Sequence, residues 1–352
     1  MKNRIARVTL LGAIGLSAAG LVLLVSGARS GHLTLTLPVE HTAEFADEHL
    51  PLFPSPLHVR GHQLVNGANE VVRLRGVMPP DPAVLDERGR FNRDFLSRIR
   101  RTNSNVIRLP VHPEEWVGDQ DYLWRYLDPL VSWAGDLGMY VVIDWHYIGN
   151  VATGAGSQMP ELDRHPKELT LEFWRLVATH YRNTPHVILE IFNEPASITA
   201  ADWRRQADQI VAVIREAGAD QLVIVGGVEY GRDLSWVASA PLADDNLAYA
   251  AHIYPVHSRA GWPNWFGGVA ERHPVLITEW GFMETSDKAE TAYLVGNRAD
   301  YGEPFLEYLD ARGIGWIACW YDDAWLPLML AKDGQGYTPY GDFVVQQLTA
   351  GP

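Results

Sequence analysis

Short apolar segments with β-strand character alternate with helix-like segments along most of this chain. The strand-like segments are rich in Val and Ile and are bounded by turn residues, a pattern typical of strands buried on both faces. Regular strand–helix alternation predicts a parallel sheet covered by helices, and eight such units favour a closed (β/α)8 TIM barrel over a doubly wound open sheet. The expected strands are Val71–Met78, Asn105–Val111, Tyr140–His146, Val187–Glu194, Gln221–Gly227, Leu247–Tyr254, Pro274–Gly281 and Ile314–Tyr321.

Helical patterns occupy most of the intervals between these strands. The weakest interval follows the fifth strand, where Arg232–Ser239 is the only candidate helix. Before the first barrel strand, the turn-forming pair Asn66-Gly67 predicts a β-hairpin between His58–Arg60 and Val71–Leu74. The other expected helices are Arg93–Thr102, Tyr122–Leu137, Pro166–Arg182, Ala201–Ala217 and Asp287–Ala311.

The first 30 residues have the composition of a targeting segment. Three basic residues precede an uncharged run of 19 residues, Val8–Ser26, and small residues follow it. Residues 1–30 are therefore either a cleaved signal peptide or a retained N-terminal membrane anchor, and both alternatives predict export. Residues 31–56 contain four prolines and predict a linker, so the expected (β/α)8 domain spans residues 57–352.

The composition limits the kinds of molecule that the protein is expected to bind. A formal net charge of −14 argues against nucleic acid and suits a soluble protein with an uncharged substrate. The 13 Trp and 14 Tyr residues include candidates for the flat platforms on which sugar rings stack. The single cysteine, Cys319, excludes an intramolecular disulfide. Strand alternation places Cys319 opposite Trp320, so we expect it to be an inert residue facing the helices.

Two glutamates stand at expected strand ends on opposite sides of the barrel. The run Val187–Pro195 ends in Asn193-Glu194-Pro195, where the proline should terminate the ladder and leave Glu194 at the rim. Glu279 ends the expected seventh strand, 85 positions later. Because strand C-terminal ends build the active site of a barrel, two carboxylates in this position predict an acid–base pair.

Seven short motifs occur in order on the expected strands. They are Leu74-Arg75-Gly76-Val77, Ile107-Arg108-Leu109-Pro110, Asp144-Trp145-His146, Ile191-Phe192-Asn193-Glu194-Pro195, His252-Ile253-Tyr254, Thr278-Glu279-Trp280-Gly281 and Trp320. In these motifs and their order the chain resembles, over residues 57–325, the family 5 glycoside hydrolases, the cellulase family within the clan A barrel glycosidases. One departure is the Tyr321–Trp325 segment after Trp320, which differs from the cellulases and leaves the substrate open.

The resemblance implies a retaining mechanism, with Glu279 as nucleophile and Glu194 as acid/base. It also implies six substrate-binding or supporting residues. Two are expected to keep the nucleophile ionised, one to bind the sugar 2-OH, two to orient sugar and carboxylates, and one to form the floor beneath the attacked sugar. These are, in that order, Arg108 and Tyr254, Asn193, His146 and His252, and Trp320.

The favoured interpretation is an exported, monomeric endo-β-1,4-glucanase acting on a polysaccharide or oligosaccharide, without a cofactor. Alternatives are a β-mannanase, a β-1,3- or mixed-linkage glucanase, a glycoconjugate hydrolase, or a non-catalytic polysaccharide-binding barrel. No metal is expected, because His-Glu-x-x-His spacing is missing from the sequence and Arg108 would repel a cation. Glu190 is expected to be a buried structural acid paired with Arg75.

Overall fold

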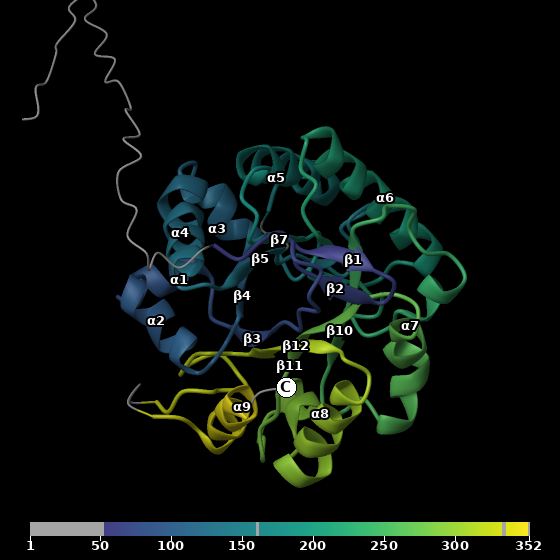
Figure 1. The fold of residues 1–352 in the computed structure, drawn as a ribbon. Coiled ribbons are helices and arrows are strands. Elements are labelled where there is room, and N and C mark those ends of the chain that lie inside the picture. The colour runs from purple at the N-terminus through teal and green to yellow at the C-terminus, as the bar shows by residue number, and fades with distance from the viewer. Residues whose placement is uncertain (1–52, 160–161, 333–335, 351–352) are drawn as a thin grey trace, which may run out of the picture. The chain divides into compact units, whose positions relative to one another are not determined.

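The computed structural model describes residues 53–159, 162–332 and 336–350. Eight parallel strands close into a barrel in the order β10-β11-β12-β3-β4-β5-β7-β9, with the helices outside it (Figure 1). The prediction of a (β/α)8 barrel is confirmed. The barrel strands are β3 (Arg75–Met78), β4 (Val106–Val111), β5 (Tyr140–Trp145), β7 (Val187–Glu190), β9 (Val223–Gly226), β10 (Leu247–Ile253), β11 (Val275–Trp280) and β12 (Gly315–Cys319).

Four of the expected helices form close to their predicted bounds. Polar N-caps fix two starts, because the side chain of Asn92 accepts from the Phe95 amide and that of Thr199 accepts from the Asp202 amide. The helices are α2 (Arg93–Arg101), α5 (Pro166–Tyr181), α6 (Ala200–Glu216), and a π-helical turn η1 (Leu123–Leu127) continuing into α4 (Asp128–Asp136). The described residues also form α1 (Pro82–Glu87), α3 (Pro113–Gly118), α7 (Gly268–Ala270), α9 (Pro339–Thr349), and short turns η2 (Ser235–Ala238), η3 (Arg259–Gly261) and η4 (Pro263–Gly267).

The single helix expected at Asp287–Ala311 is wrong. The chain forms three pieces, η5 (Ala289–Leu294), η6 (Arg298–Gly302) and α8 (Glu303–Asp310). Gly296 separates the first two, and a Cβ there would lie 2.7 Å from the Pro255 ring, so this close approach admits only glycine. Asn297 then starts η6 by accepting a hydrogen bond from the Asp300 amide.

The N-terminal hairpin is present, but with a different pairing from the one expected. Strand β1 (His58–Arg60) pairs antiparallel with β2 (Gln63–Val65), and Gly61 in the turn has a φ of 63°. Asn66 lies in the next turn, where its side chain accepts from two backbone amides and only Val71 bridges back to Val65. The sequence therefore contains two successive turns where one was expected.

The hairpin closes the N-terminal end of the barrel. Leu57 and Leu64 join the buried cluster inside the barrel, which includes Leu74, Val106 and Ile188. Residues 53–56, the only described part of the predicted linker, contact this end through ring stacking of Phe53 on His186 and a hydrogen bond from Tyr140 to the Ser55 carbonyl. The predicted targeting segment, residues 1–30, lies outside the described residues. Within the described ranges, no helix has the length and apolar character needed to cross a membrane.

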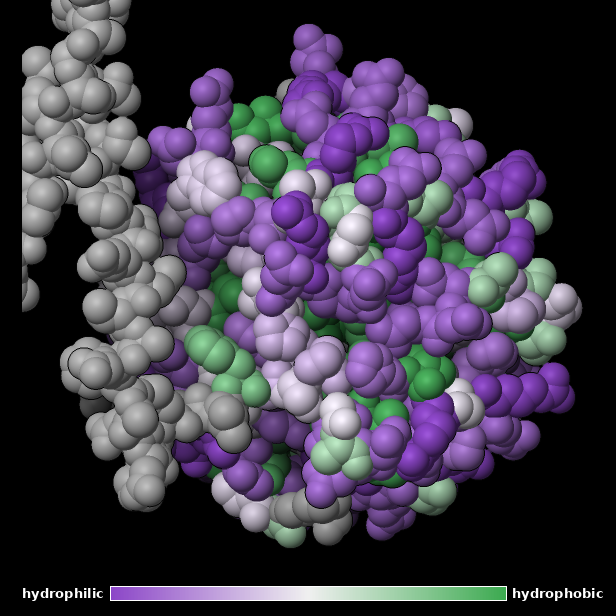
Figure 2. Space-filling view, turned by 45° about the horizontal axis from the view of Figure 1, so that its top comes forward, coloured by the Kyte–Doolittle hydropathy of each residue, from purple (hydrophilic) through white to green (hydrophobic). Residues whose placement is uncertain are grey.

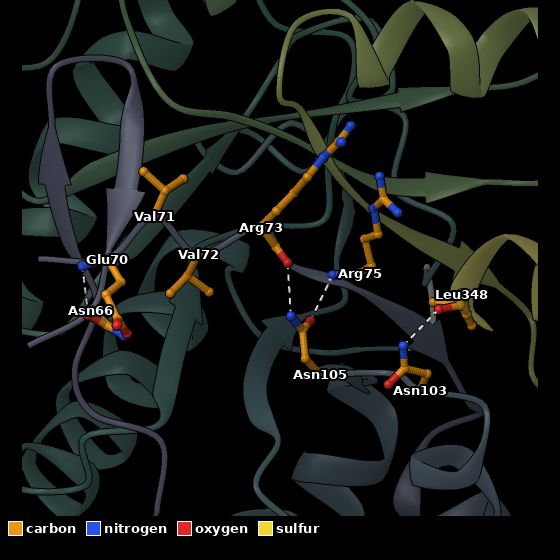
Figure 3. Close-up of a pocket in the computed structure, with 9 residues that line it drawn as sticks. All are labelled: Asn66, Glu70, Val71, Val72, Arg73, Arg75, Asn103, Asn105 and Leu348. Atoms are coloured by element: carbon orange, nitrogen blue, oxygen red, sulfur yellow. Dashed lines mark hydrogen bonds between the residues drawn. The ribbon is translucent and has the colours of Figure 1, made fainter. Parts of the chain in front are cut away.

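A cavity of about 540 Å³ lies beside the hairpin, away from the strand C-terminal ends. Figure 3 shows its polar groups largely engaged with one another: the Asn105 side chain donates to the Arg73 carbonyl and accepts from the Arg75 amide, and Asn103 donates to the Leu348 carbonyl. These hydrogen bonds connect the start of β3 to the start of β4, and the residues before β4 to α9. The face shown in Figure 2 is mainly hydrophilic, with scattered apolar residues.

Candidate active site

Glu194 lies just beyond the fourth barrel strand in a separate two-residue strand. Barrel strand β7 ends at Glu190, and β8 (Glu194–Pro195) pairs in parallel with β6 (Ile148–Gly149). Pro195 is the last residue of β8, as expected of a residue that ends a ladder, but the barrel ladder itself already ends at Glu190. The short pairing uses the amides on either side of the proline: Glu194 donates to Tyr147 at 3.1 Å and Ala196 to Gly149 at 3.1 Å. The extra pairing fixes the backbone that carries Glu194.

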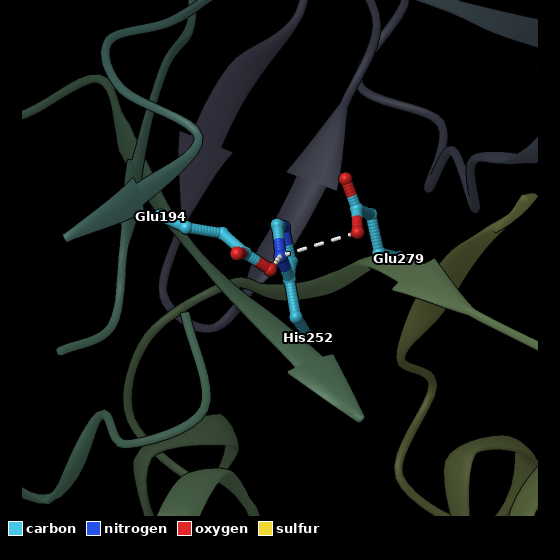
Figure 4. Close-up of side chains that lie close together, drawn as sticks. All are labelled: Glu194, His252 and Glu279. Carbon is cyan, nitrogen blue, oxygen red and sulfur yellow. Dashed lines mark hydrogen bonds and ion pairs between the residues drawn. The ribbon is translucent and has the colours of Figure 1, made fainter. Parts of the chain in front are cut away.

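Glu279 lies on β11, directly across from His252 on β10. The barrel brings Glu194, His252 and Glu279 together, so that one nitrogen of the histidine and one oxygen of each carboxylate all lie within 4.8 Å of one another (Figure 4). Both glutamates are largely buried, with side-chain exposures of 14% for Glu194 and 6% for Glu279. Carboxylates remote in the sequence therefore meet in one site, as the strand ends predicted.

Arg108 is the fully buried centre of the site. Its guanidinium donates to Glu190 at 2.6 Å and to Glu279 at 2.8 Å, and it lies 3.1 Å from Asp144. It also donates to the side-chain carbonyl of Asn193 at 2.8 Å. A buried guanidinium requires such partners, since an unpaired charge in the interior is costly. Arg108 thus connects the ends of four barrel strands.

Glu279 is held in its ionised form. Burial alone would raise the pKa of this carboxyl, but the positive charges of His252 and Arg108 outweigh burial and lower the pKa to about 2. Tyr254 contributes to the shift by donating its hydroxyl to the second Glu279 oxygen at 2.8 Å. Each oxygen of Glu279 therefore accepts a hydrogen bond from a buried donor.

Both ring nitrogens of His252 form hydrogen bonds in the site. Thr278 donates its only hydroxyl proton to Glu190 at 2.7 Å, so His252 Nε2, 3.1 Å from the same hydroxyl, must be the donor in that contact. The other nitrogen, Nδ1, faces carboxylate oxygens of Glu194 at 2.9 Å and Glu279 at 3.5 Å. Burial lowers the pKa of His252, but the nearby carboxylates raise it above its ordinary value.

Glu194 differs from Glu279 in its protonation. Burial raises the pKa of Glu194, and the negative charge of Glu279 raises it further, against the opposing hydrogen bond from His252. The site therefore contains one carboxyl that stays ionised and a neighbour that retains its proton more readily. Such a pair can supply a nucleophile and an acid to the same substrate.

The remaining expected residues lie around this pair. His146 Nδ1 forms a hydrogen bond with the Asp144 carboxyl at 2.5 Å. Burial lowers the pKa of the His146 ring well below its ordinary value. Its ring centroid is 5.8 Å from that of Trp320, which is partly exposed. Asn193 is bound to Arg108, as described above. The structure therefore brings all eight expected site residues into one continuous group.

Two supporting residues differ from expectation or were missed. The partner of Glu190 is Arg108, whereas the expected partner, Arg75, forms an ion pair with Asp310. Thr278 binds both Glu190 and His252, although alternation would place it opposite Glu279. The register with both neighbouring strands shifts in this part of β11, and such an irregularity allows consecutive residues to face the same side. Nothing in the sequence marks that shift.

The expected orientation of Cys319 is also wrong. The residue belongs to the buried cluster inside the barrel, and its sulfur lies 3.3 Å from the Tyr254 hydroxyl. Strand β12 ends at Cys319, so alternation does not extend to Trp320. Burial raises the pKa of the thiol far above its ordinary value, so it is not a nucleophile.

The group Glu194, His252 and Glu279 is also the one arrangement among the described residues with the spacing to ligate a metal ion. The other contacts of these residues oppose metal binding. Both Glu279 oxygens already accept hydrogen bonds from Arg108 and Tyr254, and the Arg108 guanidinium places a permanent positive charge beside the carboxylate. Proton chemistry fits these residues better than metal chemistry.

A family model described as cellulase (glycosyl hydrolase family 5) matches residues 83–323. The chain belongs to glycosyl hydrolase family 5. The predicted family is thereby confirmed, and the matched region contains every residue of the site described above.

Similar curated proteins carry the names endoglucanase and cellulase. The chain is 30% identical over 241 residues to Endoglucanase A of Butyrivibrio fibrisolvens, covering 65% of this chain and 52% of that protein. It is 29% identical over 252 residues to Cellulase CelDZ1 of Thermoanaerobacterium sp, covering 64% and 60%. The chain thus spans a little over half the length of these relatives.

Among solved structures, the β-glucanase SdGluc5_26A from Saccharophagus degradans superimposes with a TM-score of 0.80 at 27% identity. The match covers 84% of this chain and 94% of that one. That enzyme has also been solved in complex with cellotetraose.

Proposed function

We propose that this protein is a retaining β-glycoside hydrolase, with Glu279 as nucleophile and Glu194 as acid/base, and that its substrate is a β-1,4-glucan. One observation carries the proposal: oxygens of the two carboxyls approach within 4.8 Å, with pKa values shifted in opposite directions. Retaining enzymes place their carboxyls roughly 5–5.5 Å apart, whereas inverting enzymes leave about 6.5–9.5 Å for a water.

In the first step, Glu279 attacks the anomeric carbon of the bound sugar, and the bond to the leaving oxygen breaks. Glu194 gives its proton to that oxygen, so the leaving sugar departs as a neutral alcohol. As the ester forms, Glu279 loses its negative charge, which removes one cause of the raised pKa of Glu194. Glu194 can then take a proton from water, whose oxygen attacks the same carbon and releases Glu279.

The surrounding residues have supporting roles in this proposal. Arg108 and Tyr254 keep Glu279 ionised and fix its orientation through the two hydrogen bonds described above. Asn193, oriented by Arg108, binds the sugar 2-OH, a contact that strengthens in the oxocarbenium-like transition state. His146 and His252 orient the sugar and Glu194, and Trp320 provides the floor beneath the attacked sugar.

The substrate proposal is supported by the relatives, whose names include endoglucanase and cellulase, and by the cellotetraose complex of the β-glucanase. We further propose that the enzyme is exported, because its N-terminal sequence resembles a targeting segment and a glucan polymer is degraded outside the cell. A barrel that only binds polysaccharide would need aromatic platforms, but not two carboxyls with opposite pKa shifts.

The decisive experiment compares Glu279→Gln, Glu194→Gln and the matched surface variant Glu172→Gln on soluble glucans and mannans, with reducing-sugar release as the readout. Glu172 is half-exposed on α5, where it pairs with Arg164. Turnover should be lost in the first variant, fall by about 10²–10⁴-fold in the second, and remain at the wild-type level in the third. A 2-deoxy-2-fluoro glycoside should label Glu279. Full activity in a folded Glu279→Gln variant would exclude the mechanism, and preferential hydrolysis of mannan would exclude the proposed substrate.

A further inference from the structure

The segment that departs from the cellulase pattern, Tyr321–Trp325, continues the active site. Trp325 contacts Trp320 with their ring centroids 4.8 Å apart and their planes at 89°. It also contacts His112, with centroids 5.4 Å apart, and His112 lies 4.5 Å from His146. Trp320, His146, His112 and Trp325 therefore form a closed group of four rings, two of which belong to the expected site. We call this group the aromatic corner.

A buried ion pair holds Trp325 in this position. The Asp322 carboxylate is fully buried, and Arg88 donates to both of its oxygens at 2.9 and 2.8 Å. The same carboxylate accepts from the Trp325 amide at 2.8 Å, and the Arg88 guanidinium carbon lies 5.6 Å from the Trp325 ring centroid. Arg90 adds bonds to Asp322 and Asp323. Several fixed contacts around a partly exposed tryptophan indicate a pre-organised surface rather than a mobile loop.

Trp325 lies on the side of the site away from the acid. Trp325 follows β12, and its supports follow the neighbouring strands β3 and β4, whereas Glu194 follows β7. In the closed barrel three strands separate β12 from β7 in either direction, so the two lie on opposite sides. The leaving sugar must lie beside the acid that protonates its oxygen. Trp325 therefore faces the part of the substrate on the other side of the attacked sugar.

We propose that Trp325 is a substrate-binding residue that forms, at a right angle to the Trp320 floor, the wall of a subsite for the sugar preceding the attacked one. The assignment rests on the proposed glycosidase function. A perpendicular wall contacts the edge or the exposed face of that sugar while Trp320 lies beneath its neighbour. Trp is suited to this because its large ring packs against the apolar C–H surface of a sugar and its N–H remains free to bind a hydroxyl.

The test uses three chromogenic β-glycosides with one leaving group, carrying glucose, cellobiose or cellotriose. In the wild-type enzyme the second sugar should increase kcat/KM. Trp325→Ala should reduce this gain about tenfold, the scale of one lost aromatic contact, so that kcat/KM falls about tenfold further for the cellobioside than for the glucoside, while Trp325→Phe should retain most of the gain. Equal losses on all three substrates would show a merely structural role and overturn the proposal, as would a loss first seen with the third sugar.

A binding measurement separates this proposal from the proposed function. In the Glu279→Gln background, cellotriose binding can be followed by calorimetry without turnover, and Trp325→Ala should weaken it about tenfold. Unchanged binding would overturn the assignment even if the enzyme hydrolyses glucan, and weakened binding would support it even if hydrolysis fails. Trp124→Ala is the matched control, because Trp124 is 51% exposed on η1 and contacts His180; it should alter neither measurement.

Discussion

Replacing Tyr254 by Phe should move the acidic limit of activity to higher pH. The substitution keeps the ring but removes the hydroxyl that donates to Glu279 at 2.8 Å. A hydrogen bond to a charged group stabilises that form by about 1.5–3 kcal/mol, and about 1.4 kcal/mol corresponds to one pKa unit. The pKa of Glu279, about 2 in the intact site, should therefore rise by roughly one to two units.

The sign follows from the requirement that the nucleophile be ionised. Activity is lost as the pH falls through the pKa of Glu279, so a raised pKa causes the loss to begin at higher pH. The assay is kcat/KM for a chromogenic β-cellobioside between about pH 2.5 and 7. Near pH 3.5, the wild-type enzyme should retain most of its activity and the Tyr254→Phe variant about half.

Circular dichroism at each pH is needed to show that the protein remains folded. Tyr308→Phe is the matched control, because the Tyr308 hydroxyl has no hydrogen-bond partner in the described part of the chain, and its profile should match that of the wild type. An unchanged acidic limb in a folded Tyr254→Phe variant would refute the assignment of Tyr254 as a residue that sets the charge of Glu279.

Three further perturbations test other parts of the site. Arg108→Met should lower the free energy of unfolding by about 3–5 kcal/mol, measured with denaturant, because it leaves buried carboxylates without their charged partner; a neutral effect would show that these acids are protonated in the folded protein. Thr278→Val removes the acceptor for His252 Nε2, so the pKa of His252 should fall by up to about one unit and activity should be lost at lower pH on the alkaline side of the profile. Glu194→Ala should slow release of sugar leaving groups more than release of activated phenols, and azide should restore turnover as a β-glycosyl azide; absence of that product would contradict the acid/base role.

The sequence was sufficient to predict the strands but not all of the segments between them. The barrel strands are short apolar runs, which the sequence shows directly. Both ends of β5 and of β10 therefore lie within one residue of their predicted positions. The helix expected at Asp287–Ala311 fails in part for a local reason, because it contains Gly296, Gly302 and Pro304, which are poor helix formers. At Gly296 the Pro255 ring from another loop also approaches too closely for a side chain, a tertiary contact that the local sequence does not show.

In the active site, too, some features could be predicted from the sequence and others could not. Glu194 and Glu279 could be predicted because strand C-terminal ends converge in any barrel. The partner of Glu190, the orientation of Thr278 and the inward position of Cys319 could not. The orientation of Thr278 and the position of Cys319 depend on where a strand shifts its register or ends, and a shift of one residue reverses the face on which a side chain lies. The pattern of alternation contains no record of these local shifts.

Burial cannot explain which acid of the site is the nucleophile, because it raises the pKa of all four carboxyls: Asp144, Glu190, Glu194 and Glu279. The site has two positive groups to balance them, Arg108 and His252, and both face Glu279. Only there does their attraction exceed the effect of burial, so Glu279 is ionised while the other three keep raised pKa values, Asp144 at about 7.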